Sequence, residues 1–501
     1  MFKIIQSASL SGAVSLPVQV EVSASTGLPQ ETIIGLPDTV IKESRSRVKS
    51  AILLSEFEFP AMSYVINLAP TDIPKKNISL ELAISVAILS ITNQIQTNND
   101  YCFIGGLSLD GSIVPIKQLL PIIYHYPNYK NKIFVISKKN EADISPLNDL
   151  SIITIDHLKE LKDLSKKPIK TVSFLAPKPN PCMGSFDDVK GHYLAKQACA
   201  FSIIGRHPLL FVGEPGIGKT MLIERMKDLL PPLNNNQSLE NCCTELLLTQ
   251  QMHYTTTPPY RAPHHSISYA GMIGGKNPPQ PGEITRANHG LLFLDEIGEY
   301  QRAILDTLRE PMETKKIQLS RAGNTIAFPA NFLLATAMNP CHCGYQTSTN
   351  HMCRCLPHQI QKYWQRISQP FLDRISICLI LSPNESNPMH ISNDDLKNLI
   401  QNGITMAQKR NPNQQPNQQL SIEEIQDMSQ ISDLTEQRFD DFFKKNGSSM
   451  RAKKRLYQLS RTIADGMNDH QIKSEHVSIA IQLNQHHQLP TQKSSWGLRP
   501  I

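Results

Sequence analysis

The chain has 501 residues, which is too many for one hydrophobic core, and the usual domain size of about 100 to 200 residues predicts about three domains. Hydrophobic residues make up 40% of the sequence and charged residues 19%, a composition typical of soluble globular proteins, which excludes a disordered chain. The net charge of +6 allows a polyanionic partner but does not require one, because a mild excess of Lys and Arg usually only solvates a surface.

The first part of the chain is expected to form a domain of mixed strands and helices. Up to about residue 165, short runs rich in β-branched residues alternate with helical patterns such as Thr39 to Leu54. The expected strands are Val18 to Val22, Tyr64 to Leu68, Phe103 to Leu107, Ile133 to Ile136 and Ile152 to Ile155. The segment Ala176 to Pro181 is rich in proline and should be extended, so it indicates a domain boundary.

Neither a secretion signal nor a membrane span is evident. Residues 1–22 contain one lysine and no apolar run of signal-peptide length, and the most apolar stretch, Ile78 to Ile91, is short and contains Glu81. We therefore expect a cytoplasmic protein, in which closely spaced cysteines indicate metal binding rather than disulfides.

The most informative segment is GEPGIGKT, which lies between the apolar run Leu209 to Val212 and a helical pattern, Met221 to Leu230. A strand, a glycine-rich turn and a helix in this order are typical of a phosphate-binding loop, because glycines let backbone N–H groups close around phosphate oxygens. Lys219 would supply a positive charge to the β- and γ-phosphates of ATP, and Thr220 a hydroxyl to Mg²⁺. The predicted nucleotide-binding residues are Gly213, Glu214, Pro215, Gly216, Ile217, Gly218, Lys219 and Thr220.

Polar residues also follow two other predicted strands. The apolar run Leu291 to Leu294 ends in Asp295 and Glu296, a pattern typical of a buried parallel strand with carboxylates at its C-terminal edge. There Asp295 would bind Mg²⁺ through its hydration shell, and Glu296 would orient or deprotonate the attacking water; solvated acids after a core strand are the alternative. A third strand, Phe332 to Thr336, ends near Asn339. Its amide would contact the γ-phosphate or the water, or it is an ordinary turn residue before a proline.

Four cysteines form two closely spaced pairs, Cys341 with Cys343 and Cys353 with Cys355. Thiolates at this spacing can close a tetrahedral Zn²⁺ site, which would order a polar loop; free thiols are the alternative. The remaining cysteines show no ligand spacing and are expected to be ordinary residues. They are Cys102, Cys182, Cys199, Cys242, Cys243 and Cys378.

The last part of the chain is expected to be helical. Residues 384–420 are rich in Asn, Gln and Pro, so exposed loops and hinges are expected there. The helical patterns that follow predict a small helical domain, with Ser449 and Ser474 as N-cap candidates. These patterns are Thr435 to Lys445, Ser449 to Met467 and Lys473 to Gln485. The basic run at 453–455 is interpreted as a solvated face, with nucleic-acid contact as the alternative.

Further motifs stand out along the chain. In the second half they are Arg261 to Gly271 (RAPHHSISYAG), Pro281 to Ile284 (PGEI), Leu308 to Glu313 (LREPME), Ala337 to Cys341 (AMNPC) and Phe371 to Arg374 (FLDR). In the first part they are Gly35 to Asp38, Lys42 to Arg45 and Asn67 to Lys75. Together these motifs resemble the ComM/YifB family of magnesium-chelatase-like AAA+ ATPases, essentially from end to end.

The resemblance implies an α/β fold, with an AAA+ P-loop NTPase core in which helices flank a parallel sheet. It also implies a Lon-protease-like (ribosomal S5-like) α+β domain before the core and a helical lid after it. The expected bounds are 1–170 for the Lon-like domain, 171–185 for a proline-rich linker, 186–385 for the core and 386–501 for the lid. Within the core, a helix-2 insert is expected at 260–282, a presensor-1 hairpin at 315–330 and the cysteine loop at 341–355.

The resemblance also assigns roles to single residues. Asn339 resembles the sensor-1 residue, Arg374 the arginine finger that reaches the γ-phosphate of the neighbouring subunit, and Arg451 the sensor-2 arginine. The better studied members are hexameric DNA helicases that promote branch migration during natural transformation. The expected partners are therefore ATP, Mg²⁺, single-stranded or branched DNA and further copies of the chain, with no membrane.

In such rings the insert and the hairpin face the central pore. Arg321, near the predicted hairpin tip, is the first candidate for a DNA phosphate contact, together with His264 and His265 of the insert. Family members often carry a second basic residue where this chain has Gly323, which predicts a weaker grip on DNA. A purely structural hairpin is the alternative.

Two other functions compete with a DNA motor: a chelatase- or chaperone-type remodeller of a protein client, and an ATP-dependent protease. A chelatase role would require a partner subunit with an integrin-like domain, and none is expected in this chain. For the protease, Ser79 lies close to the position of the Lon nucleophile, but Leu120 occupies the position expected for the activating lysine. Proteolysis is therefore disfavoured, because a serine hydroxyl without a base is a poor nucleophile.

Overall fold

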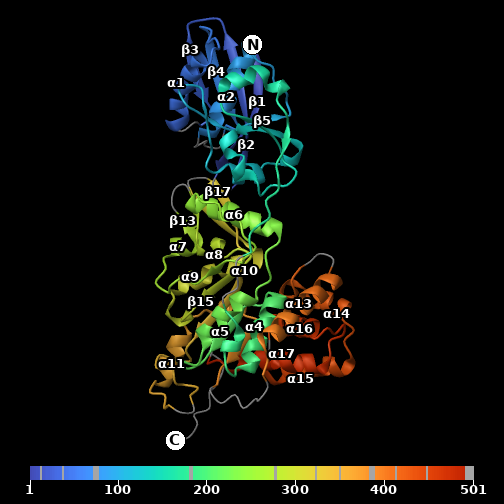
Figure 1. The fold of residues 1–501 in the computed structure, drawn as a ribbon. Coiled ribbons are helices and arrows are strands. Elements are labelled where there is room, and N and C mark those ends of the chain that lie inside the picture. The colour runs from blue at the N-terminus through green and yellow to red at the C-terminus, as the bar shows by residue number, and fades with distance from the viewer. Residues whose placement is uncertain are drawn as a thin grey trace.

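The structure is a computed structural model that describes residues 1–11, 14–36, 39–71, 78–179, 184–275, 279–321, 324–348, 351–382, 390–411, 415–446 and 449–490. Figure 1 shows an N-terminal part at one end, a central core, and a group of helices against the side of the core. The motif residues 37–38 and 72–75, and Cys182, lie outside the described ranges. Within those ranges, no helix is both long enough and apolar enough to cross a membrane.

The N-terminal part is built on an eight-stranded mixed sheet with the order β10-β9-β8-β5-β1-β2-β4-β3. The strands are β1 (Phe2–Ser11), β2 (Val14–Ser25), β3 (Gln30–Ile34), β4 (Ser63–Ala69), β5 (Tyr101–Phe103), β8 (Ile133–Ser137), β9 (Ser151–Ile155) and β10 (Lys170–Thr171). Helix α1 (Thr39–Leu54) has the predicted bounds, and α2 (Glu81–Ile91) is buried along its whole length against β1 and β2. The mixed strand and helix pattern predicted for this part is confirmed.

One predicted strand in this part is wrong. The run Phe103 to Leu107 is not continuous, because β5 ends at Phe103 and β6 (Gly106–Leu107) pairs with β7 (Ile113–Val114) in a separate hairpin. Between them, the N–H of Gly105 donates to the carbonyl of Ser79 instead of to a neighbouring strand. The apolar run therefore indicates that these residues are buried, but it does not indicate a single strand.

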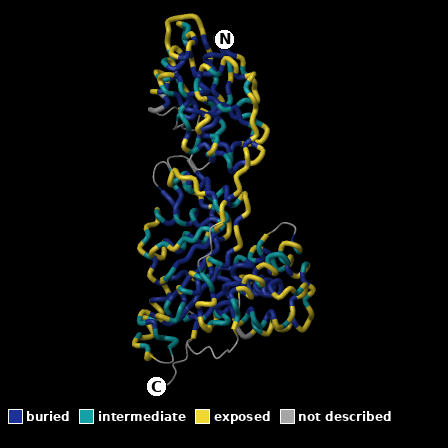
Figure 2. The backbone as a smooth tube through the Cα atoms, viewed as in Figure 1, coloured by how far each residue is buried: buried dark blue, intermediate teal, exposed yellow. Residues whose placement is uncertain are grey.

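A continuous apolar cluster, which we call the apolar joint, connects the N-terminal part with the core. Helix α3 (Leu119–Tyr124) packs on α6 (Asn235–Thr249), and the side chains that meet there include Leu119, Leu120, Ile123, Leu239, Cys242, Cys243 and Leu246. In Figure 2 the buried trace continues through the interior of both parts. The two parts thus share a core in addition to the connecting chain.

The core is a five-stranded, fully parallel sheet with the order β12-β15-β18-β11-β19. Its strands are β12 (Tyr260–Arg261), β15 (Leu291–Leu294), β18 (Leu333–Met338), β11 (Leu209–Val212) and β19 (Ile377–Ile380). Every residue of β11, β15 and β18 is buried, as expected for apolar runs in a sheet covered on both faces. The predicted α/β core is confirmed.

Short helices and two hairpins complete the core. The helices are α4 (Tyr193–Gly205), α5 (Lys219–Met226), α7 (Tyr269–Ile273), α8 (Glu283–Arg286), α9 (Arg302–Thr307), α10 (Arg309–Thr314), α11 (Pro357–Trp364) and α12 (Gln369–Leu372). Strands β13 (Gly274–Gly275) and β14 (Gln280–Pro281) pair beside α7. In the longer hairpin of β16 (Lys316–Arg321) and β17 (Asn324–Pro329), Arg321 pairs with Asn324, so the turn lies where it was predicted. The residues of that turn and the side chain of Arg321 lie outside the described part.

The C-terminal part is helical, as predicted, but it begins earlier than the composition suggests. Its helices are α13 (Asn393–Arg410), α14 (Ile422–Met428), α15 (Asp433–Asn446), α16 (Met450–Gly466) and α17 (Ser474–Leu483). The expectation of loops throughout 384–420 is wrong, because Leu396 and Ile400 of α13 are buried in the core cluster. Ser449 is the N-cap of α16 as predicted, whereas Ser474 is the first residue of α17 and not its cap.

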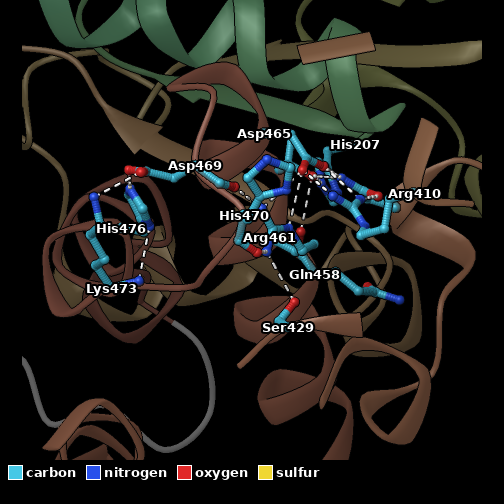
Figure 3. A network of polar contacts seen from close by, with 12 residues as sticks. His207, Arg410, Ser429, Gln458, Arg461, Asp465, Asp469, His470, Lys473 and His476 are labelled. Atoms are coloured by element: carbon cyan, nitrogen blue, oxygen red, sulfur yellow. Dashed lines mark hydrogen bonds and ion pairs between the residues drawn. The ribbon is translucent and has the colours of Figure 1, made fainter. Parts of the chain in front are cut away.

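A buried polar network ties the lid helices to each other and to the core (Figure 3). Asp465 is fully buried and accepts hydrogen bonds from Arg410, Arg461 and Asn417. Arg461 is also fully buried, and its remaining donors reach the hydroxyl of Ser429 and two backbone carbonyls. From the core, a ring nitrogen of His207 lies 2.8 Å from the hydroxyl of Thr462 on α16. The two buried charges are thus paired and hydrogen-bonded, as burial requires.

Candidate active site

The glycine-rich loop forms a cradle between β11 and α5. Gly216 and Gly218 have φ values of +79° and +100°, in the left-handed region that favours glycine. Lys219 lies inside the loop, where its Nζ donates to the carbonyls of Gly213 (2.7 Å) and Glu214 (3.0 Å). Burial lowers the pKa of Lys219, and the carboxylates of Asp295 and Glu296 act in the opposite direction. A buried ammonium group inside a glycine-rich loop that opens a helix matches what a phosphate-binding loop requires.

The side chains predicted from the three strands meet beside this loop. The hydroxyl of Thr220 donates to Oδ2 of Asp295 over 2.8 Å, and Nζ of Lys219 donates to Oδ1 of Asn339 over 3.0 Å. This convergence follows from the register, in which Val212 is level with Met338 and Leu294 with Thr336, so the strands end at the same edge of the sheet. A hydroxyl and a carboxylate side by side are the oxygen donors that Mg²⁺ prefers, so these residues fit the ion.

Glu296 follows Asp295 with a strained backbone. Its φ is +50°, and its N–H donates to Oδ1 of Asp295. Its carboxylate is half exposed and lies 3.7 Å from Nδ1 of His265, whose ring packs at a tilt against that of His264, with centroids 4.0 Å apart. The resemblance predicts that both histidines lie in an insert that faces DNA, but it gives no sign that His265 reaches the carboxylate expected to act on water. Strain of this kind in a non-glycine residue is common at functional sites.

The insert motifs are held together by ion pairs. Arg261 forms two hydrogen bonds with Glu283, at 2.5 and 2.7 Å, and Arg286 binds Glu283 and Glu245 of α6. These contacts connect the motif that begins at Arg261 with the motif that contains Glu283. They fix the start of the insert against β12 and α6.

The two arginines with roles implied by the resemblance lie together, away from the phosphate loop. Arg374 and Arg451 both line a pocket of about 600 Å³, and of the described residues around that pocket none belongs to the phosphate loop, Asp295, Glu296 or Asn339. Arg374 is held by Oε1 of Glu313 at 2.8 Å and by the carbonyl of Pro370 at 2.7 Å. Its Nε is buried and has no hydrogen-bond partner among the residues that the structure describes.

The interpretation of the run 453–455 as a solvated face is wrong for Arg455. Arg455 is buried, and its Nη1 donates to the backbone carbonyls of Leu372 and Ile375, on either side of Arg374. Lys454 lines the same pocket as Arg374 and Arg451. The run thus contributes to a basic pocket between the core and the lid.

The four cysteines predicted to bind metal come together. All four Sγ atoms lie within 4.8 Å of one another, and the sulfur of Cys341 is 3.3 Å from that of Cys343. Burial raises the pKa of the Cys343 thiol, but backbone N–H groups of Tyr345 and Arg354 and the neighbouring thiols outweigh it and lower that pKa to about 6. Of the other described cysteines, all are buried and free.

The residue nearest to a Lon-type nucleophile lies in the interior of the N-terminal part. Ser79 is fully buried, and its hydroxyl donates to the carbonyl of Ala8 over 2.9 Å. Leu120 is buried in the apolar joint, and Lys117 reaches the amide oxygen of Gln250. At the position expected for the activating lysine, the chain thus has a buried apolar side chain.

A glycine-rich loop opening a helix, beside a strand that ends in two acids, defines the class of P-loop nucleoside triphosphatase folds. Family models match most of the chain: "Magnesium chelatase, subunit ChlI" at residues 185–389, "Subunit ChlI of Mg-chelatase" at 20–140 and "Magnesium chelatase, subunit ChlI C-terminal" at 391–484. The chain therefore belongs to the magnesium-chelatase-like AAA+ family, in its ComM/YifB branch, as the following relatives show.

Among those relatives, the protein YifB of Salmonella typhimurium is 34% identical over 493 residues, and the competence protein ComM of Haemophilus influenzae is 34% identical over 502 residues. In both cases the match covers 95% of this chain and 96% of the relative. The magnesium-chelatase 38 kDa subunit of Cereibacter sphaeroides is 24% identical over 177 residues, or 31% of this chain and 52% of that protein.

Proposed function

We propose that the protein is an ATP-hydrolysing motor that works as a hexameric ring on DNA, in branch migration during recombination or natural transformation. The observation that carries the ATPase proposal is the meeting of Lys219, Thr220, Asp295 and Asn339 at the shared edge of three parallel strands. The competence relative supports a role in transformation. The alternative is a chelatase- or chaperone-type remodeller of a protein client.

In this proposal each residue of the site acts on one part of ATP. Lys219 and the loop N–H groups bind the phosphates, and Asn339 positions the γ-phosphate or the attacking water. Thr220 and Asp295 would hold Mg²⁺, which neutralises charge on the β- and γ-phosphates when bound. Glu296 orients or deprotonates water, and its approach to His265 would let a DNA contact on the insert act directly on this step.

The ring proposal rests on the position of the arginines. Arg374 and Arg451 line a pocket separate from the ATP site of their own chain, and that pocket also contains Lys454. Such a basic pocket suits the phosphates of a nucleotide bound by the next subunit, where an arginine stabilises the transferring phosphoryl group. In a ring each site would then be completed by its neighbour.

For the remaining parts we propose supporting roles. The N-terminal part would be a Lon-like domain without proteolytic activity, since Ser79 is buried and bonded to a carbonyl. The hairpin with Arg321, and His264 and His265 of the insert, would face DNA. The cysteine loop would hold one Zn²⁺ in a structural role.

Replacing Lys219 should impair ATP binding, whereas replacing Glu296 should impair only hydrolysis. Because hydrogen bonds to charged groups contribute about 1.5 to 3 kcal/mol, Lys219→Ala should weaken ATP binding by about 10- to 100-fold. Glu296→Gln should bind ATP normally, because Glu296 acts only on the water. Lys190→Ala, which removes an exposed lysine of the same domain, is the matched control. Titration with a fluorescent ATP analogue measures all three; unchanged affinity in Lys219→Ala contradicts the site.

A DNA motor should respond to nucleic acid and to salt. We expect the ATPase rate to rise with single strands, duplex or a four-way junction, and DNA affinity to fall by orders of magnitude from about 50 to 200 mM salt, since several phosphate contacts release counterions. Arg321→Ala should weaken DNA binding with little change in basal ATPase, whereas Lys397→Ala, on the exposed side of α13, should not. An affinity that does not change with salt favours the protein remodeller.

A further inference from the structure

The sulfur atoms of the cysteine loop are already arranged for a metal ion. The Sγ atoms of Cys341, Cys343 and Cys353 lie 3.3, 3.7 and 3.5 Å apart, and that of Cys355 completes a group within 4.8 Å. A tetrahedral zinc ion with Zn–S bonds of about 2.3 Å requires sulfurs about 3.8 Å apart. The two ends of the loop thus supply four thiols close enough together to bind one ion, and four cysteine ligands are typical of structural zinc.

The loop lies directly on the phosphate loop. Gly344 follows Cys343 in the left-handed region, with φ at +84°, and its N–H donates to the carbonyl of Cys341. A Cβ at Gly344 would lie 2.5 and 2.6 Å from ring carbons of Pro215, so the backbone of the cysteine loop packs against the proline of the phosphate loop. A displacement of the cysteine loop would therefore displace the phosphate-binding backbone as well.

The two ends of the loop reach other parts of the ATP site. At one end, Cys341 comes two residues after Asn339, and the indole N–H of Trp364 fixes the intervening carbonyl of Pro340 at 3.0 Å. At the other end, Cys355 leads into α11, where the ring of Tyr363 packs on Gly298 so closely that a Cβ there would lie 2.7 Å from it. Gly298 belongs to the 3₁₀ turn Ile297–Glu299 that begins directly after Glu296.

We propose that Cys341, Cys343, Cys353 and Cys355 bind one Zn²⁺ per chain, and that the zinc-held loop braces the phosphate loop, so that zinc occupancy sets the affinity for ATP. This inference rests on the proposed ATPase function and adds a regulator to the same site. Thiolate ligands select zinc over Mg²⁺, which binds oxygen, so the two metals would not exchange. Loss of one hydrogen bond to a charged phosphate would weaken ATP binding by about 10- to 100-fold.

The test combines metal analysis with ATP binding. Full-length protein purified without added zinc should contain about one zinc per chain by elemental mass spectrometry. Cys343→Ser with Cys355→Ser removes one half-buried ligand from each pair and should lose the zinc. It should also bind a fluorescent ATP analogue, in saturating Mg²⁺, about 10- to 100-fold more weakly. His351→Ala, in the same loop but outside the thiol group, should keep the zinc and the affinity.

A second variant distinguishes the effect of the packing between the two loops from the effect of the metal. Gly344→Ala keeps all four thiols but places a methyl group against Pro215, so it should retain zinc and still lose ATP affinity by a similar factor. Iron instead of zinc, or no metal, overturns the metal assignment. Normal ATP affinity in both the zinc-free and the Gly344→Ala proteins overturns the proposal that the cysteine loop supports the phosphate loop. If the wild type itself binds no ATP, the proposed ATPase fails, while the zinc content still decides the metal site.

Discussion

Mixing two inactive variants, Arg374→Ala and Glu296→Gln, is expected to restore ATP hydrolysis. Each variant alone should bind ATP. Arg374→Ala should hydrolyse it about 10³- to 10⁵-fold more slowly, the usual contribution of an arginine that meets charge on the transferred phosphoryl group, and Glu296→Gln should not hydrolyse it because it cannot act on the water. If Arg374 serves the next subunit, an intact Glu296 faces an intact Arg374 at about a quarter of the interfaces of a randomly mixed ring. The ATPase rate of equimolar mixtures, measured after subunit exchange, tests this.

The matched control is a mixture of Arg374→Ala with the double variant Arg374→Ala, Glu296→Gln. In both mixtures half of the subunits have an intact Glu296. In the control no subunit has Arg374, so no interface is complete and the rings should remain inactive. If the first mixture does not hydrolyse ATP although mixed rings are confirmed, then Arg374 acts within its own chain or hydrolysis needs several adjacent sites. Dilution of the variant into wild-type rings distinguishes those two cases. Glu313, which holds Arg374 at 2.8 Å, would have to release it when the interface forms.

Removing the buried carboxylate of Asp465 should have the largest effect on stability. Asp465→Ala leaves the fully buried guanidinium of Arg461 without its charge partner, and breaking such a pair typically costs about 3 to 5 kcal/mol. Native-state hydrogen exchange of α13 and α16 measures the free energy of local opening, which is better defined here than a single transition of a multidomain chain.

Asp394→Ala is the matched control for this prediction. Asp394 lies on α13 with its side chain almost fully exposed and 3.9 Å from Lys397, so its loss should cost less than about 1 kcal/mol. Equal effects of the two substitutions would mean that the network in Figure 3 does not hold the lid. Because His207 of the core contacts Thr462 in the same network, Asp465→Ala should also loosen the lid from the core.

The ATP site could be predicted from the sequence because its parts follow from local patterns. Leu209–Val212 and Leu291–Leu294 are apolar runs with the observed strand bounds. The residues that follow parallel strands, here the loop before Lys219, Asp295 and Asn339, must meet at one edge of the sheet. The cysteine pairs could be grouped for the same reason, since each pair is close in sequence. Local order therefore gave the position of these residues.

Contacts between distant segments could not be predicted. Nothing in the insert motif shows that His265 reaches Glu296, and nothing near Gly344 shows that it packs on Pro215. Composition was misleading where burial in the tertiary structure determines the outcome. Helix α13 forms within an Asn- and Gln-rich stretch because Leu396 and Ile400 are buried. Arg455 is buried although it belongs to a basic run. These outcomes depend on packing partners that are far away in the chain.

The apolar joint has a mechanical consequence. Domains connected only by an extended segment reorient almost freely, whereas domains that share a packed core are displaced as one stiff body. Helix α6 carries the joint on one side, and on the other its Asn241 and Glu245 bind Asn288 and Arg286, just before β15. A load applied to the N-terminal domain would thus reach the strand that ends in Asp295 and Glu296 without passing through the linker. A displacement of that domain would therefore be transmitted to the carboxylates that are proposed to act on ATP.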